Sequence, residues 1–148
     1  MGDRVSISFV NEIECIHDKR REESVPLFNH WGGSHFPEYA LNWVKKLKKE
    51  IKENKEKIST PYTRLEPQNV MVLFIADLQK DKQFADYTNP NRITHSIYLG
   101  KDLQDGDNSD NGHFVIDINC EKIWTYYKQY PTLNWVGERI KNEWKRIY

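Results

Sequence analysis

The stretch of this sequence with the most chemistry in the least space is a short turn between a predicted strand and a predicted helix. It carries two histidines, a tryptophan, two glycines and a serine: His30, Trp31, Gly32, Gly33, Ser34 and His35. A glycine turn that leads into a helix N-terminus exposes backbone amides, and the helix dipole adds partial positive charge there. We therefore take Gly32, Gly33 and Ser34 as candidate residues for binding a phosphate or a carboxylate.

The flanking side chains could add catalysis or ring recognition to such a site. His30 and His35 titrate near neutral pH and are the candidate catalytic residues, as acid or base, and Trp31 could stack on a ring. The alternative is architectural, because glycine serves tight turns and a tryptophan fills a core. The pattern is neither a dinucleotide-binding glycine motif nor a P-loop, so both interpretations stay open.

An acidic segment near residue 110 raises the question of a metal ion. Asp107, Ser109, Asn111 and Gly112 match the opening of an EF-hand calcium loop, but its last position, normally glutamate, is Ile118. A solvated hairpin loop is the better interpretation of such residues. The histidines of the turn have no third or fourth zinc ligand nearby in the sequence. We expect no metal ion and no cofactor.

The elements that position these residues follow from periodicity and turn signals. Alternating apolar residues predict strands over 4–9, 24–29, 94–99, 113–118 and 123–127. Apolar stripes at helical spacing predict helices over 37–57, 67–80 and 132–146. The second of these could be a buried strand, but Pro67 suits the first turn of a helix. The charged run 18–23 is typical of a solvated turn, and Pro26 favours an edge or a bulge for its strand.

These elements predict one α+β domain over residues 1–148. We expect a mainly antiparallel sheet of four or five strands packed with about three helices, since the last strands leave little room for crossover connections. A chain of 148 residues is long enough to bury a sizeable core.

Composition limits the classes of function. Lys plus Arg equals Asp plus Glu, 22 each, and this balance argues against a dedicated nucleic-acid binder, although lysines dominate one face of the 37–57 helix. No apolar run is long enough to span a membrane. Cys15 and Cys120 have no metal-binding or redox spacing, and the N-terminus has no secretory pattern, so we expect a cytoplasmic protein with reduced thiols.

One resemblance is carried by the residues Ser24-Val25-Pro26-Leu27-Phe28-Asn29-His30-Trp31-Gly32-Gly33 and by the strand 114–117. A strand that ends in His-Trp-Gly-Gly and leads into a helix resembles small uncharacterised proteins of prokaryotic and phage genomes. Pro26 departs from the alternating strand of those proteins. The resemblance implies a shared fold and a role for the turn, and it implies no activity.

The sequence leaves three functions open. The leading hypothesis is a binding or interaction module centred on the His30–His35 turn, with a protein partner, a homodimer or a small anionic ligand. The first alternative is a small hydrolase or transferase that acts on an anionic or phosphorylated substrate, with the turn as its anion site. The second alternative is an accessory protein that binds RNA or DNA through the lysine face.

Overall fold

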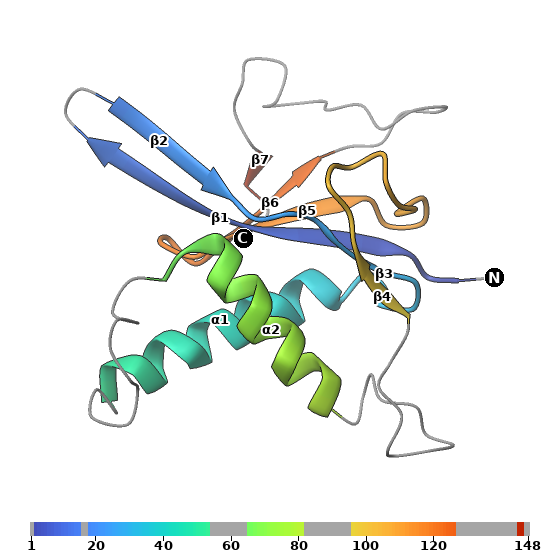
Figure 1. The fold of residues 1–148 in the computed structure, drawn as a ribbon, viewed down its shortest axis with the longest axis horizontal. Coiled ribbons are helices and arrows are strands. Elements are labelled where there is room, and N and C mark those ends of the chain that lie inside the picture. The colour runs from blue at the N-terminus through green and yellow to red at the C-terminus, as the bar shows by residue number, and fades with distance from the viewer. Residues whose placement is uncertain (1, 16–17, 54–64, 82–95, 127–144, 147–148) are drawn as a thin grey trace.

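The computed structural model describes residues 2–15, 18–53, 65–81, 96–126 and 145–146. The strands in these ranges are β1 (Val5–Cys15), β2 (Asp18–Glu23), β3 (Leu27–Asn29), β4 (Ile97–Leu99), β5 (His113–Asp117), β6 (Lys122–Tyr126) and β7 (Lys145–Arg146). The helices are α1 (Phe36–Glu53) and α2 (Pro67–Lys80). Figure 1 shows the sheet from one edge, with both helices on one side of it.

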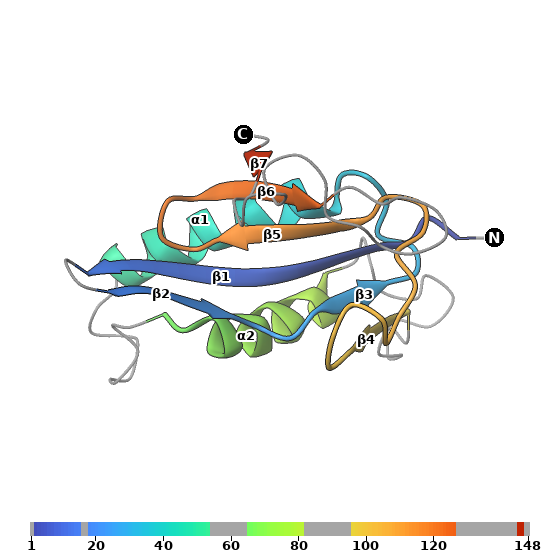
Figure 2. The same ribbon diagram turned by 90° about the horizontal axis from the view of Figure 1, so that it is seen from above.

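The sheet has β1 at its centre. Its strand order is β4-β3-β1-β5-β6-β7, and β2 lies off this path as a second partner of β1. The first half of β1 pairs with β3 and its second half pairs with β2, both antiparallel, while β5 runs parallel to β1 along the other edge. Seen from above, the strands follow one another from β4 to β7 across the molecule (Figure 2). The chain thus belongs to the α+β class, with a mixed sheet.

Several details of the predicted fold were wrong. The sheet is not mainly antiparallel, because its two central strands are parallel, and the described residues form seven strands and two helices. The charged run 18–23 is strand β2 and not a turn. A strand can be this polar when its backbone pairs with a single neighbour, because the ladder and not side-chain burial then holds it.

Two further expectations concern proline and the C-terminus. Pro26 precedes β3, and β3 is not an edge strand, since β1 and β4 flank it. Most of the predicted helix 132–146 lies outside the described residues, but its end, Lys145–Arg146, pairs with β6 as strand β7 and is not helical. The start of the predicted strand 94–99 also lies outside the described residues, and the rest of it is β4.

The helical predictions for the middle of the chain are confirmed. α1 begins at Phe36 and buries Ala40 and Val44 of the predicted apolar face, and it also buries Leu41, which was not part of that face. The predicted end of this helix, 54–57, lies outside the described residues. α2 is a helix and not a strand: Pro67 stands in its first turn, where a missing N–H costs no hydrogen bond. The hairpin of β5 and β6 also lies where the alternating pattern placed it.

The two faces of the sheet carry different side chains. Val5, Ile7 and Phe9 of β1 point toward the helices and join one buried cluster with α1 and α2. Ser6 and Ser8 point to the opposite face, because successive residues of a strand alternate. The segment 100–112 returns across that opposite face, where a Cβ placed on Gly106 would lie 2.5 Å from the Phe28 ring. The sheet therefore has an apolar helical side and a partly polar loop side.

Candidate functional site

The His30–His35 turn leaves the end of β3 and enters α1, as the sequence indicated. Gly33 has a φ of 76°, which side chains other than hydrogen disfavour. Gly32 has no room for a side chain, since a Cβ there would lie 2.6 Å from Cγ1 of Val5. Both glycines therefore have a structural reason to be glycine, as the architectural interpretation requires.

Little in the geometry of the turn favours an anion. The Gly33 N–H donates to the carbonyl oxygen of Asp3 at 2.9 Å. The Asp3 carboxylate lies beside the same residue, 3.0 Å from where a Gly33 Cβ would be. Pro37 removes one amide of the first helical turn, and the Phe36 N–H donates to Gly33. The negative charge of Asp3 disfavours a phosphate here. Anion binding by Gly32, Gly33 and Ser34 stays a prediction.

The aromatic residues of the turn differ in exposure. Trp31 is 60% exposed and does not fill the core. The His30 ring is half-buried and meets the Trp31 ring edge-on, with centroids 4.8 Å apart. His35 is exposed and lies past the glycines, where its carbonyl oxygen accepts the Tyr39 N–H. An exposed tryptophan is a side chain that proteins often use to bind partners.

The turn lies beside β4, and this neighbourhood was not visible in the sequence. The His30 N–H donates to the carbonyl oxygen of Ser96 at 2.9 Å, immediately before β4 begins. In β4, Tyr98 is 43% exposed and Leu99 is 52% exposed. Trp31, Tyr98 and Leu99 thus place three large apolar surfaces along one edge of the sheet. We call these three residues the edge surface.

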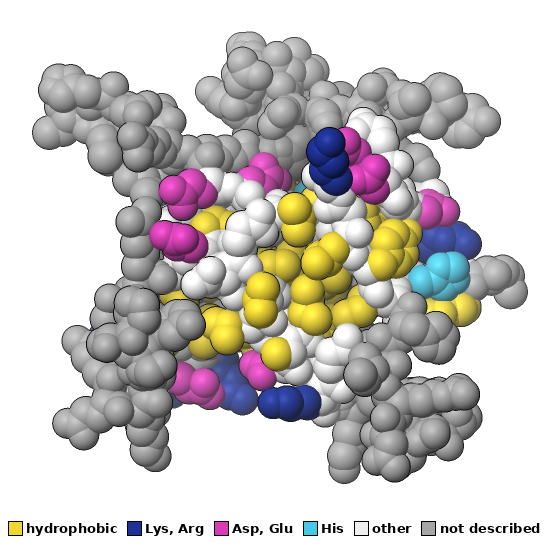
Figure 3. Space-filling model, in the orientation of Figure 1, with side chains coloured by type: hydrophobic (Ala, Val, Ile, Leu, Met, Phe, Trp, Pro, Cys, Tyr) yellow, Lys and Arg dark blue, Asp and Glu magenta, His cyan; other side chains and the backbone are white. Residues whose placement is uncertain are grey.

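The apolar surface continues over α2. Val72 and Leu73 are the other large hydrophobic residues exposed in the described part of the chain. Figure 3 shows hydrophobic side chains gathered in the middle of the face where α2 and β4 lie. Exposed apolar side chains that gather on one face mark sites of interaction more often than isolated ones do.

A buried hydrogen-bonded chain lies on the loop side of the sheet. His113 is 1% exposed, and its Nδ1 and Nε2 atoms lie 2.8 Å from Ser6 Oγ and 3.1 Å from Ser8 Oγ. The Ser8 hydroxyl donates to Oε1 of Glu23 at 2.7 Å, and Asn108 Nδ2 donates to Ser6 Oγ at 2.7 Å. Since each hydroxyl has one hydrogen, this pattern in a neutral imidazole makes Nε2 the protonated nitrogen and Nδ1 an acceptor.

This series of hydrogen-bonded residues resembles a Ser–His–Glu catalytic arrangement in its residue types only. Ser6, Ser8 and His113 are all buried, so a substrate has no access to a nucleophilic hydroxyl, and the geometry instead satisfies polar groups inside the fold. Sequence reasoning missed the chain, because Ser6 and Ser8 read as the solvated face of a strand. Their spacing of two, together with a histidine at a later strand start, was the available signal.

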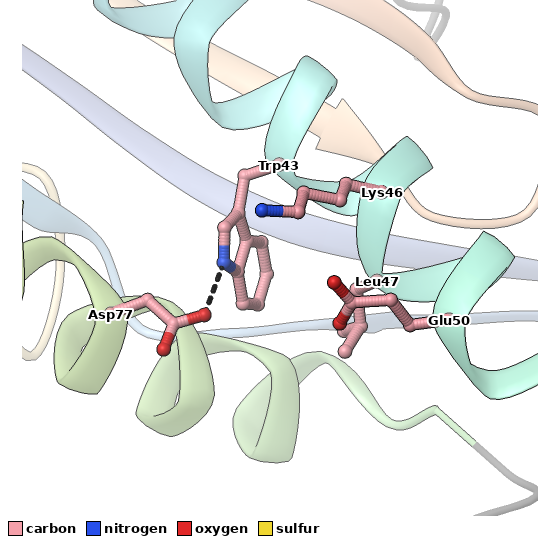
Figure 4. A pocket seen from close by; sticks show the side chains of 5 residues that line it. All are labelled: Trp43, Lys46, Leu47, Glu50 and Asp77. Carbon is pink, nitrogen blue, oxygen red and sulfur yellow. Dashed lines mark hydrogen bonds between the residues drawn. The ribbon is translucent and has the colours of Figure 1, made fainter. Parts of the chain in front are cut away.

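A small pocket lies between α1 and α2 (Figure 4). Its residues are Trp43, Lys46, Leu47, Glu50 and Asp77, and its volume is about 50 Å³, room for a few water molecules. The Trp43 indole N–H donates to Oδ2 of Asp77 at 2.8 Å. The pocket is therefore already closed on one side by an interhelical hydrogen bond.

A second interhelical bond lies beside the pocket. The Tyr39 hydroxyl donates to Oδ2 of Asp81. Burial raises the pKa of Tyr39 well above its ordinary value, and the Asp81 hydrogen bond and the charges of Asp81 and Asp77 raise it further. Asp77 of α2 and Asp81, the residue after its last turn, thus link this helix to α1.

The acidic loop forms ion pairs with Arg4 of the N-terminal segment. Nε of Arg4 lies 3.3 Å from Asp107 Oδ2, and Nη1 of Arg4 lies 3.5 Å from Asp110 Oδ2. Asn111 Nδ2 donates to the Asp3 carboxylate at 2.6 Å. These contacts hold the loop to the N-terminal strand. Among the described residues, no group of three or more His, Cys, Asp or Glu side chains is placed to hold a metal ion.

One lysine on the lysine face of α1 contacts the rest of the fold, and others are exposed to solvent. The Lys48 ammonium donates to the Ile118 carbonyl oxygen at 2.9 Å and pairs with Glu121 at 3.2 Å, so it joins α1 to the β5–β6 hairpin. Lys45, Lys46 and Lys49 are exposed. No helix in the described ranges has the length and apolar character needed to cross a membrane.

Comparisons with protein-family models, with curated proteins and with solved structures each find no match to this chain.

Proposed function

We propose that this protein is an interaction module that binds a partner protein through the edge surface, Trp31, Tyr98 and Leu99. The observation that carries the proposal is the exposure of these three large side chains at the end of one sheet. Tryptophan and tyrosine dominate binding energy at protein interfaces. The proposal keeps the binding role expected from the sequence and moves its centre from the glycines of the turn to the neighbouring sheet edge.

The local structure supports this role by holding the backbone at Trp31 and the side chain of Tyr98 in place. The Trp31 N–H donates to Oδ1 of Asn29 at 3.1 Å. The Tyr98 ring stacks on the buried Phe28 ring, with centroids 5.2 Å apart and planes 11° apart, and its hydroxyl accepts the Asp107 N–H at 3.1 Å. Side chains held in this way lose little entropy when a partner binds.

The hydrolase and nucleic-acid alternatives have weaker support. Asp3 places a carboxylate beside the glycines where an anionic substrate would lie, and the pocket between α1 and α2 is not at the turn. One of the lysines of α1 already serves the fold. Both alternatives stay predictions.

A selection of short random peptides against the full chain tests the proposal. We expect enriched peptides to bind with saturation in calorimetry, and we expect Leu99→Lys to weaken binding by about tenfold or more, as the loss of one apolar anchor predicts. Lys45→Glu, on the exposed face of α1, is the matched control and should bind like the parent. Peptides that bind both variants equally, or no enriched peptide at all, would count against the edge surface.

A further inference from the structure

The geometry of β4 points to the form of the partner. We infer that an extended, basic segment of another protein adds to the sheet as a further strand beside β4. This inference rests on the proposed function, because it concerns the same surface and names what binds there.

The backbone of β4 has open hydrogen-bonding groups on its outer side. In the antiparallel ladder with β3, His30 donates to Ser96 and Gly100 donates to Pro26, and Phe28 pairs with Tyr98 midway between them. Hydrogen-bonded pairs alternate with non-bonded pairs in such a ladder. The N–H and C=O groups of Ile97 and Leu99 therefore point away from β3, toward the position of a next strand.

These groups select an extended occupant. A helix uses its backbone N–H and C=O groups for its own hydrogen bonds, and a loop presents them at irregular spacing. A strand presents these groups at the spacing that matches β4. In the strand order of the described residues, β4 is an end member with β3 as its one neighbour. An added strand would continue the sheet in the direction visible in Figure 2.

The side chains of β4 set the character of the incoming segment. Leu99 lies on the helical side of the sheet, opposite the buried Leu27, and Tyr98 lies on the loop side against Phe28. Both keep about half of their surface exposed. Directly opposed side chains on neighbouring strands contact one another, so apolar or β-branched residues should occupy both faces of the added strand.

The charge at the end of β4 favours a basic residue in the partner. The segment 101–112 carries four aspartates and one lysine. Arg4 pairs with Asp107 and Asp110, whereas Asp102 and Asp105 are exposed and accept backbone amides of their own turn. A lysine or arginine next to this turn would gain from these two carboxylates, and salt would weaken the gain.

A second copy of this chain fits the edge less well. Two copies of β4 paired about a twofold axis would place Tyr98 against its own equivalent. The three residues of β4 would also contribute few hydrogen bonds to such a pair. A longer extended segment of another protein satisfies the same backbone groups over more residues and can carry a basic residue beside Asp102 and Asp105.

The test uses the isotope-labelled full chain and one synthetic peptide, acetyl-Arg-Val-Thr-Val-Thr-Val-amide. We expect saturable amide shifts at residues 97–99, and we expect hydrogen exchange at the Ile97 and Leu99 amides to slow by about tenfold near saturation. Two N-methylated versions of the peptide, blocked on alternate residues, should differ: one edge of a strand pairs with β4 and the other faces solvent. One version should therefore bind and the other should not.

Charge and self-association complete the test. Replacing the arginine of the peptide by glutamate should weaken binding several-fold at low salt, and the double variant Asp102→Asn, Asp105→Asn should remove that difference. Equal binding of the two N-methylated peptides would overturn strand addition while leaving the edge surface as a binding site. No binding of the peptide, or a dimer in sedimentation that Leu99→Lys abolishes, would also overturn the inference; the random-peptide selection decides separately whether the proposed function survives.

Discussion

At the scale of single residues, the buried His113 shows how a polar side chain can be structural in a place where its neighbours suggest chemistry. Its two ring nitrogens each have a serine hydroxyl. In a neutral ring, the hydrogen bonds that run from Asn108 to Glu23 place the hydrogen on Nε2. The histidine is thus held in one tautomer by two serines that a strand pattern alone would place in solvent.

The serine nearest to Glu23 should be essential to that arrangement. We expect Ser8→Ala to destabilise the fold by about 1–3 kcal/mol, since it leaves a buried imidazole N–H and a carboxylate without their shared partner. Denaturant unfolding measures the loss. In the parent protein, nitrogen NMR of the His113 ring should show Nε2 protonated and Nδ1 bare.

Ser34→Ala is the matched control, because Ser34 is exposed in the turn and such changes usually stay within about 0.5 kcal/mol. Equal stability of the two variants, or a ring protonated at Nδ1, would contradict the described chain of hydrogen bonds.

At the scale of elements, α1 and α2 are joined by aromatic donors on α1 and carboxylates on α2 or just after it. Trp43 donates to Asp77, and Tyr39 donates to Asp81 at the end of α2. The donors are amphipathic rings whose apolar parts pack on Phe74 while their polar ends reach the helix surface. The helix pair is therefore held by packing inside and by hydrogen bonds outside.

The raised pKa of Tyr39 gives this contact a pH signature. Because the folded state holds the neutral phenol, its stabilising effect is complete below the ordinary tyrosine pKa of 10.0 and is lost as the pH rises further. We expect ultraviolet titration to show one tyrosine that ionises after the others, and Tyr39→Phe to remove it. Unfolding free energy should fall above pH 10 more steeply in the parent than in that variant.

Tyr98→Phe provides the comparison, since Tyr98 is an exposed tyrosine on β4 and lies on neither helix. A late ionisation that persists in Tyr39→Phe would contradict the assignment to Tyr39.

At the scale of the whole molecule, Phe74 of α2 joins the helical layer to the sheet. It is fully buried, and its ring contacts those of Phe9 of β1 and of Phe36, Tyr39 and Trp43 of α1. The two layers are thus joined through one ring cluster. Removing the central ring should weaken the packing of every element that contacts the cluster.

We expect Phe74→Ala to lower the free energy of unfolding by about 3–5 kcal/mol, the usual cost of deleting a buried aromatic side chain. Denaturant unfolding followed by tryptophan fluorescence measures the loss. Leu73→Ala, one position earlier on the exposed face of α2, should cost far less. Similar losses for the two variants would mean that the core is not centred on Phe74.

The sequence by itself determined the local elements of this protein. Helical spacing and Pro67 determined α2, alternation determined β5 and β6, and the glycines determined the turn after β3, because each of these depends on neighbours in the chain. The resemblance carried by the His-Trp-Gly-Gly stretch stays a prediction of the sequence. The charged strand β2 escaped sequence reasoning, since its backbone pairing with β1 leaves no apolar alternation in the sequence.

Only the tertiary structure decided which distant segments meet. The parallel pairing of β1 with β5, the contact of Ser6 and Ser8 with His113, and the position of β4 beside the His30–His35 turn join residues far apart in the chain. Periodicity reports which face of an element is buried, but not what it is buried against. The edge surface depends on that second kind of information, because Trp31 lies at the same sheet edge as Tyr98 and Leu99 only when β4 pairs with β3.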